Sequence, residues 1–258
     1  MNNIKIIFFD IDGTLIDMNK KQISAKMLET LIRLREKNIK ICLATGRTPV
    51  SLPHLEGVEF DAYLTFNGSY CYNAEQVIFS NPIPTQDVKT IIRNAASINR
   101  PVSLATKNRL AANGKDEDLE EYYSFAKLEV EIADDFEQVV YDEIYQIMLG
   151  CREKDYPQLL KNVHNARITA WWDRAADVIP SGSGKGTGIE KVLACYHINK
   201  SEAMAFGDGN NDMEMLQAVG LGVAMGNASE ELKKTADDIC GHVADDGIYH
   251  YCVACGLM

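Results

Sequence analysis

The sequence lacks the features that mark secreted, membrane-spanning and nucleic-acid-binding proteins. The N-terminal apolar run in MNNIKIIFFDIDG is short and acids follow it at once, which fits neither a signal peptide nor a membrane span. Asp and Glu (37) outnumber Lys and Arg (26). The resulting formal charge of −11 would repel nucleic acid and anionic membranes. The seven cysteines are scattered and form no dense framework, so we expect a protein of the reducing cytoplasm.

What remains is an ordinary globular composition. The chain has 258 residues, of which 46 % are hydrophobic and 24 % charged, and it shows no internal repeat or low-complexity segment. That length is enough for one large domain or for two modest domains with separate cores.

The hydrophobic pattern at both ends of the chain is typical of a parallel α/β sheet. Short apolar runs of the kind found in strands buried on both faces alternate with amphipathic helical stretches, the first of which Ser24 can cap. The predicted strands at the two ends are residues 4–9, 39–44, 62–66, 202–207 and 221–225.

The pattern between these two ends is different. After about residue 81 the predicted strands cluster and partly alternate, which indicates an antiparallel α+β module. These strands are expected at 101–106, 128–132, 143–149 and 166–172. We therefore predict a Rossmann-like α/β core made of residues 1–81 and 181–258, with an α+β domain inserted at 82–180.

A lysine flanked by glycines, in the stretch IPSGSGKGTGIEKV, stands where the chain returns to the first pattern. A nucleotide-binding P-loop is excluded, because Gly186 follows Lys185 where Ser or Thr is required. The glycines predict a flexible connection. A lysine at the start of a helix, where backbone N–H groups already favour an anion, also indicates phosphate binding.

Four aspartates stand shortly after the ends of predicted strands. Asp10 ends the first strand and Asp12 lies two residues further on, while Asp208 and Asp212 follow the strand at 202–207. Ligands of open α/β sheets bind beyond the C-terminal ends of strands, so both pairs are expected on one rim. The rim also receives Thr45 and Gly46, which follow the strand at 39–44.

This set of side chains is rich in oxygen and suits Mg²⁺, which binds few carboxylates and bridges to phosphate. Asp10 is then positioned to attack phosphorus and form an aspartyl-phosphate. Thr45, Lys185 and the metal would neutralise the phosphoryl oxygens. Asp12 would protonate the leaving alkoxide and then take a proton from the hydrolytic water.

The motifs DIDGT at 10–14, TG at 45–46, Lys185 and GDGNND at 207–212 together resemble those of the haloacid dehalogenase superfamily, in its Cof-type subgroup with the large C2-type (IIB) cap. The position and length of the insert also resemble that cap. The resemblance implies that Thr45 and Gly46 bind phosphate, as does Asn211. It further implies that Asp208 binds the metal directly, that Asp212 supports it, and that Asp12 offers its backbone carbonyl.

The resemblance also implies the substrate class. We expect a phosphomonoesterase acting on small phosphorylated metabolites, with sugar phosphates as the expected class. A phosphatase of flavin mononucleotide or pyridoxal phosphate, a phosphomutase, and a non-catalytic phosphate-binding protein remain open as alternatives.

Overall fold

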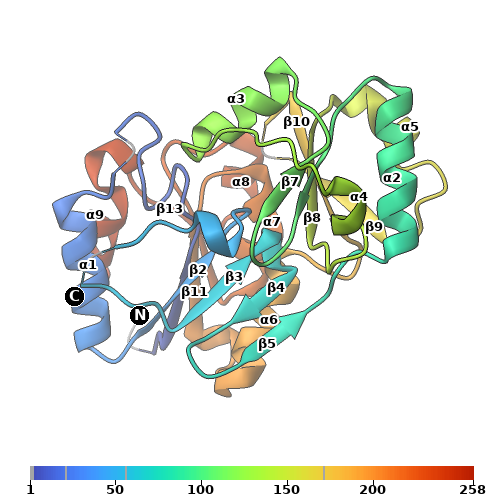
Figure 1. Cartoon of the computed structure of the whole chain (residues 1–258). Coiled ribbons are helices and arrows are strands. Elements are labelled where there is room, and N and C mark those ends of the chain that lie inside the picture. Colours follow the sequence, from blue (N-terminus) through green and yellow to red (C-terminus); the bar gives the residue numbers. More distant parts are fainter. Residues whose placement is uncertain (1–2, 21, 56, 171) are drawn as a thin grey trace. The chain divides into compact units, whose positions relative to one another are not determined.

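A computed structural model describes residues 3–20, 22–55, 57–170 and 172–258 of the chain (Figure 1). The chain divides into two compact units. The first consists of Met1–Gly46, Pro53–Ser80 and Gly184–Met258, and the second of Arg47–Leu52 and Asn81–Ser183.

The first unit is built on a single sheet, which has eight strands within the described residues. Its order is β13-β12-β11-β1-β2-β3-β4-β5, and all neighbours are parallel except at β4 and β5, which form an antiparallel edge. The strands are β1 (Ile6–Phe9), β2 (Lys40–Ala44), β3 (Ala62–Thr65), β4 (Tyr70–Tyr72), β5 (Val77–Ser80), β11 (Ala203–Gly207), β12 (Leu221–Ala224) and β13 (Asp238–Ile239).

Helices cover both faces of this sheet, which explains why its central strands read as continuous apolar runs. Helix α1 packs against α9, and α6 packs against α7 (Figure 1). Ser24 caps α1 as predicted, because its side chain accepts a hydrogen bond from the N–H of Met27. The helices are α1 (Ala25–Glu36), α6 (Lys185–Tyr196), α7 (Met213–Ala218), α8 (Glu230–Thr235) and α9 (Gly247–Ala254).

The second unit holds a five-stranded antiparallel sheet in the order β7-β6-β8-β10-β9. Its strands and helices are β6 (Ser103–Ala105), β7 (Leu110–Ala112), β8 (Gln146–Gly150), β9 (Ala166–Thr169), β10 (Ala175–Pro180), α2 (Thr85–Ser97), α3 (Glu117–Phe125), α4 (Phe136–Val139) and α5 (Tyr156–Leu159). Val88 and Ile91 of α2 share a buried core with Leu104, Ile147 and Val178 of the sheet. The unit therefore has an apolar core of its own.

Six short 3₁₀ turns complete the described elements. They are η1 (Pro49–Ser51), η2 (Phe66–Gly68), η3 (Glu153–Asp155), η4 (Lys200–Glu202), η5 (Asn210–Asp212) and η6 (Val243–Asp245).

The predicted α/β class, with a parallel sheet and an α+β insertion, is confirmed. One strand prediction is wrong: residues 128–132 contribute only an isolated bridge between Ile132 and Ala112. The strand predicted at 166–172 ends at Thr169, and Trp171 lies outside the described residues.

Candidate active site

The sheet order brings the ends of β1 and β11 together. These strands are parallel neighbours, with Phe9 paired to Phe206, and the two rings stack at 5.6 Å between centroids. Strand β2 lies on the other side of β1, so the order of the strands reverses here. Crevices at such reversals are where open α/β sheets bind ligands. Asp10 follows β1 directly, and Asp208 follows β11.

Lys185 joins the two acid clusters. It is the first residue of α6, and only 1 % of it is exposed. Its Nζ donates hydrogen bonds to Oδ1 of Asp10 and to Oδ1 of Asp212, both at 2.6 Å. Burial by itself would lower the pKa of Lys185, but the two carboxylates raise it above its ordinary value. The lysine therefore stays charged between two aspartates that are far apart in the sequence.

Of the glycines that predict a flexible connection, Gly182 and Gly184 lie where the chain passes from the second unit to the first, but Gly186 lies beyond that junction. Gly186 lies inside α6, and a Cβ there would come within 2.8 Å of the carbonyl oxygen of Glu214. The absence of a side chain lets α6 approach α7 closely, and this contact places Lys185. Gly186 is thus a packing residue and does not act as a hinge.

Asp212 holds its own loop as well as the lysine. Its Oδ2 accepts hydrogen bonds from the N–H groups of Asp208 and Gly209, both at 3.0 Å. The side chain is fully buried. Because both carboxylate oxygens already accept hydrogen bonds, Asp212 is suited to orienting its neighbours.

Asp208 lies against the turn that follows β1. Thr14 donates its hydroxyl to Oδ1 of Asp208 at 2.7 Å. Gly13 has a φ of +90°, and a Cβ there would lie 2.2 Å from Oδ2 of Asp208. Only glycine can hold this backbone conformation and leave room for the carboxylate. Steric constraints therefore explain why glycine occupies this position in the motif DIDGT.

The electrostatics of this cluster favour a cation. Oxygens of Asp10, Asp208 and Asp212 can lie within 4.8 Å of one another. Burial, and after it the neighbouring carboxylates, raise the pKa of Asp10 well above its usual range despite Lys185. Burial and Asp212 likewise raise the pKa of Asp208 to about 7. A divalent ion would relieve this repulsion, and carboxylate oxygens are hard ligands of the kind that Mg²⁺ prefers.

The other predicted site residues lie nearby in the same unit. Asp12 is half-buried in the turn after β1, where its backbone forms an isolated β-bridge with Ile16. Thr45 and Gly46 follow β2, and Thr45 is 1 % exposed. Asn211 lies in η5 next to Asp212.

Sequence analysis missed Asn67, which connects several of these residues. Its N–H donates to the carbonyl of Thr45 at 2.9 Å, and its side-chain Oδ1 accepts from Nδ2 of Asn211 at 3.2 Å. A Cβ on Gly46 would lie 3.1 Å from its Nδ2. Its place shortly after β3 is the same kind of position that singled out Asp10 after β1.

A protein-family model described as haloacid dehalogenase-like hydrolase matches residues 7–252. The chain belongs to this family. The "Putative phosphatase YkrA" of Bacillus subtilis (strain 168) is 32 % identical over 258 residues, which cover 98 % of each chain. From the same organism, 5-amino-6-(5-phospho-D-ribitylamino)uracil phosphatase YitU is 27 % identical, over 95 % of each chain.

Solved structures of haloacid dehalogenase-superfamily proteins have the same fold. A subclass IIB sugar phosphatase superposes with a TM-score of 0.89 at 30 % identity, covering 98 % of this chain and 100 % of the other. The resemblance inferred from the motifs, and the prediction of an enzyme of the phosphatase type, are confirmed. None of the helices in the described part of the chain has the length and apolarity that crossing a membrane requires.

Proposed function

We propose that this haloacid dehalogenase-like hydrolase is a Mg²⁺-dependent phosphomonoesterase of small phosphorylated metabolites, with sugar phosphates as the first candidates. The observation that carries the proposal is the bridge from Lys185 to Asp10 and Asp212, with Asp208 in the same cluster. The relatives named as phosphatases, one of them a sugar phosphatase, support the substrate class.

The donor set fits a magnesium ion. Asp10 and Asp208 would bind it through carboxylate oxygens and Asp12 through its backbone carbonyl, while Asp212 would support the site from behind. Bound Mg²⁺ supplies positive charge for the phosphoryl oxygens and for the ionised carboxylates. Lys185, at the start of α6, supplies a further positive charge. Thr45, Gly46 and Asn211 would bind the phosphoryl group.

The reaction would proceed in two displacements. In the first, an oxygen of Asp10 attacks phosphorus, the bond from phosphorus to the ester oxygen breaks, and Asp12 gives its proton to the leaving alkoxide. In the second, Asp12 removes a proton from water, whose oxygen attacks the same phosphorus. The bond to Asp10 breaks, and inorganic phosphate and the free carboxylate result.

We further propose that the inserted residues 82–180 form a cap that contributes contacts to the leaving group. The support is that the second unit has its own sheet and apolar core, and that a sugar phosphatase of subclass IIB has a similar structure. A lid of this kind would exclude water from the reacting groups.

A phosphate-release assay tests the proposed activity. Purified protein is incubated with para-nitrophenyl phosphate and with a panel of sugar phosphates, in Mg²⁺ or in EDTA. We expect release only with Mg²⁺, and none from an Asp10→Asn variant that still folds. Release that persists in EDTA would contradict the metal requirement. Loss of substrate without release of phosphate would indicate a phosphomutase, and binding without turnover a phosphate-binding protein.

A further inference from the structure

One amide side chain lies at the junction of three chain segments in the first unit. Asn227 follows β12 in the stretch MGNAS, and it is half-buried. Its Nδ2 donates to the backbone carbonyl of Gly13 at 2.8 Å and lies 3.4 Å from Oδ2 of Asp208. Its Oδ1 accepts from the N–H of Val243 at 3.0 Å. Both ends of the amide are therefore engaged.

The backbone around Asn227 is itself fixed. Gly226 donates its N–H to the carbonyl of Gly241 at 3.0 Å, and Met225 donates to the carbonyl of Gly207 at 2.9 Å. The side chain thus projects from a loop that is anchored to the end of β11 and to the segment before η6. An amide held in this way can position whatever it contacts.

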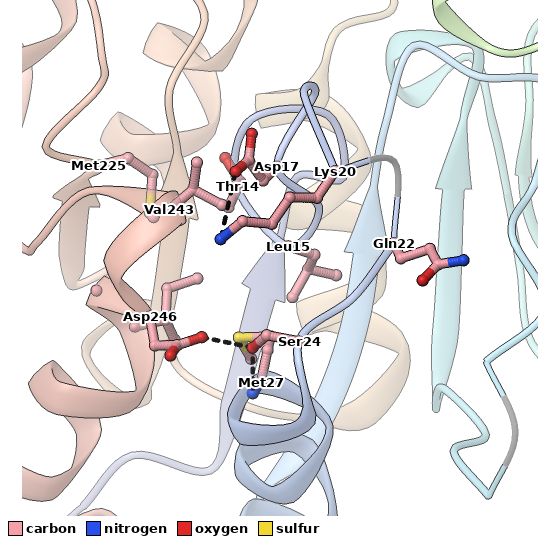
Figure 2. A pocket seen from close by; sticks show the side chains of 12 residues that line it. Thr14, Leu15, Asp17, Lys20, Gln22, Ser24, Met27, Met225, Val243 and Asp246 are labelled. Atoms are coloured by element: carbon pink, nitrogen blue, oxygen red, sulfur yellow. Dashed lines mark hydrogen bonds and ion pairs between the residues drawn. The ribbon is translucent and has the colours of Figure 1, made fainter.

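The segment that Asn227 contacts through Val243 also contacts the end of the connection from β1 to α1. Lys20 donates to the carbonyl of Ala244 at 3.2 Å, and Ser24 donates to Asp246 at 2.5 Å. Figure 2 shows Lys20, Ser24, Val243 and Asp246 lining one pocket, with the contact between Ser24 and Asp246 drawn. The segment between β1 and α1, which carries Asp12 and Gly13 near its start, is therefore also tied to residues 243–246 near its end.

Of the two groups that Asn227 Nδ2 reaches, the Asp208 carboxylate belongs to the proposed metal site and the Gly13 carbonyl adjoins it. Asp208 would bind the ion through its carboxylate, and Gly13 follows Asp12, whose carbonyl is the proposed backbone ligand. Partners behind the ligands fix ligand orientation, and their loss commonly weakens metal binding by about 10- to 100-fold.

We propose that Asn227 is a positioning residue for Mg²⁺, holding the Asp12–Gly13 turn and the Asp208 carboxylate at the spacing that the ion requires. This inference rests on the proposed function, since it presumes a metal at this site. No direct contact between Asn227 and substrate is implied.

The test is a titration of the protein with Mg²⁺ alone, without substrate. Calorimetry and the rise in melting temperature measure the affinity for Mg²⁺. We expect the Asn227→Ala variant to fold and to bind Mg²⁺ about 10- to 100-fold more weakly than the wild type. Should its melting temperature be too low to measure, Asn227→Ser serves instead, because one hydroxyl cannot span Gly13 and Asp208. It must show the same loss.

Ser229→Ala is the matched control, since it alters the same loop two residues away. Ser229 caps α8 by accepting from the N–H of Leu232 at 3.1 Å. We expect this variant to melt earlier and to keep the wild-type affinity for Mg²⁺. An Asn227 variant with wild-type affinity would overturn the inference. If the wild type itself binds no Mg²⁺, the metal part of the proposed function falls, and the inference falls with it.

Discussion

At the scale of single residues, the central feature is one lysine among several carboxylates. Lys185 contacts Asp10 and Asp212 at 2.6 Å each. A buried ion pair stabilises a protein little by itself, but breaking one leaves an uncompensated charge. A catalytic role thus explains the arrangement better than a contribution to stability does, because the arrangement holds a positive charge beside the candidate nucleophile.

Replacing Lys185 tests this explanation. We expect Lys185→Ala to lower kcat for a phosphomonoester by about 10²- to 10³-fold, as for the loss of an oxyanion donor. Lys191→Ala, a change at an exposed site on the same helix, should leave kcat unchanged. Steady-state assays at saturating Mg²⁺ measure both. A near-normal kcat for Lys185→Ala would mean that the lysine serves only packing.

Asp12 allows a second test at the same scale. If it donates the proton to the leaving alkoxide, Asp12→Ala should cost about 10²- to 10⁴-fold in kcat. The loss should be smaller for substrates whose leaving group is already a weak base, such as para-nitrophenol. An equal loss for good and poor leaving groups would argue against proton donation.

The acids of the candidate site were predicted from sequence, whereas two of its amides, Asn67 and Asn227, were not. Asp10 and Asp208 stand directly after apolar strands, so the sheet rule places them on one rim. Asn67 reaches its partners from η2, where its φ is a positive 52°, and Asn227 does so from the loop after β12. Hydrophobic periodicity carries no information about loop geometry of this kind.

At the scale of elements, prediction succeeded where burial is uniform. The runs at 4–9, 39–44 and 202–207 became β1, β2 and β11, which are almost wholly buried. Strand β10 was missed although it is buried throughout, because its sequence AADVIP includes an aspartate and ends in proline. Asp177 is accommodated there through a hydrogen bond from Tyr122 at 2.7 Å, which only the tertiary structure supplies.

The turn before β11 offers a test of pH dependence. Glu202 contacts Lys5 at 2.5 Å and accepts from the N–H of Asn199 at 2.9 Å. The hydrogen bond from Lys5, followed by that from Asn199, lowers the pKa of Glu202 from 4.5 to about 2. Because the pKa is lower in the folded state, the carboxylate stabilises the fold above about pH 4.5, and this contribution is lost as the pH falls towards 2.

We therefore expect Glu202→Gln to be less stable than the wild type at neutral pH. The difference should shrink below the ordinary glutamate pKa and vanish once Glu202 is protonated in the folded protein as well. Urea unfolding of both proteins across the acid range measures it. A difference that does not change with pH would show that the charge of Glu202 contributes nothing.

At the scale of the whole molecule, the chain makes one compact unit from its two ends and another from its middle. The main segment of the middle unit, Asn81–Ser183, begins and ends at one place, since Asn81 Nδ2 donates to Ser183 Oγ at 2.9 Å. Its sheet, its helices and its apolar core all lie between these residues. A segment that has its own apolar core can in principle fold alone.

A fragment comprising residues 81–183 should therefore fold by itself. We expect a single cooperative thermal transition in circular dichroism and dispersed amide resonances. Val178→Asp, which buries a charge at a site that is 0 % exposed, should abolish the transition. A fragment without a cooperative transition would show that the middle unit depends on the rest of the chain.

The covalent role of Asp10 is the central claim, and trapping the intermediate tests it most directly. Turnover of a phosphomonoester with Mg²⁺ is stopped by acid, and the peptides are analysed by mass spectrometry. The account predicts a phosphoryl group on the Asp10 carboxylate in the wild type. The Asp10→Asn variant should carry no phosphoryl group and should release no phosphate. Sustained turnover by Asp10→Asn, or a phosphoryl group found on another residue, would contradict it.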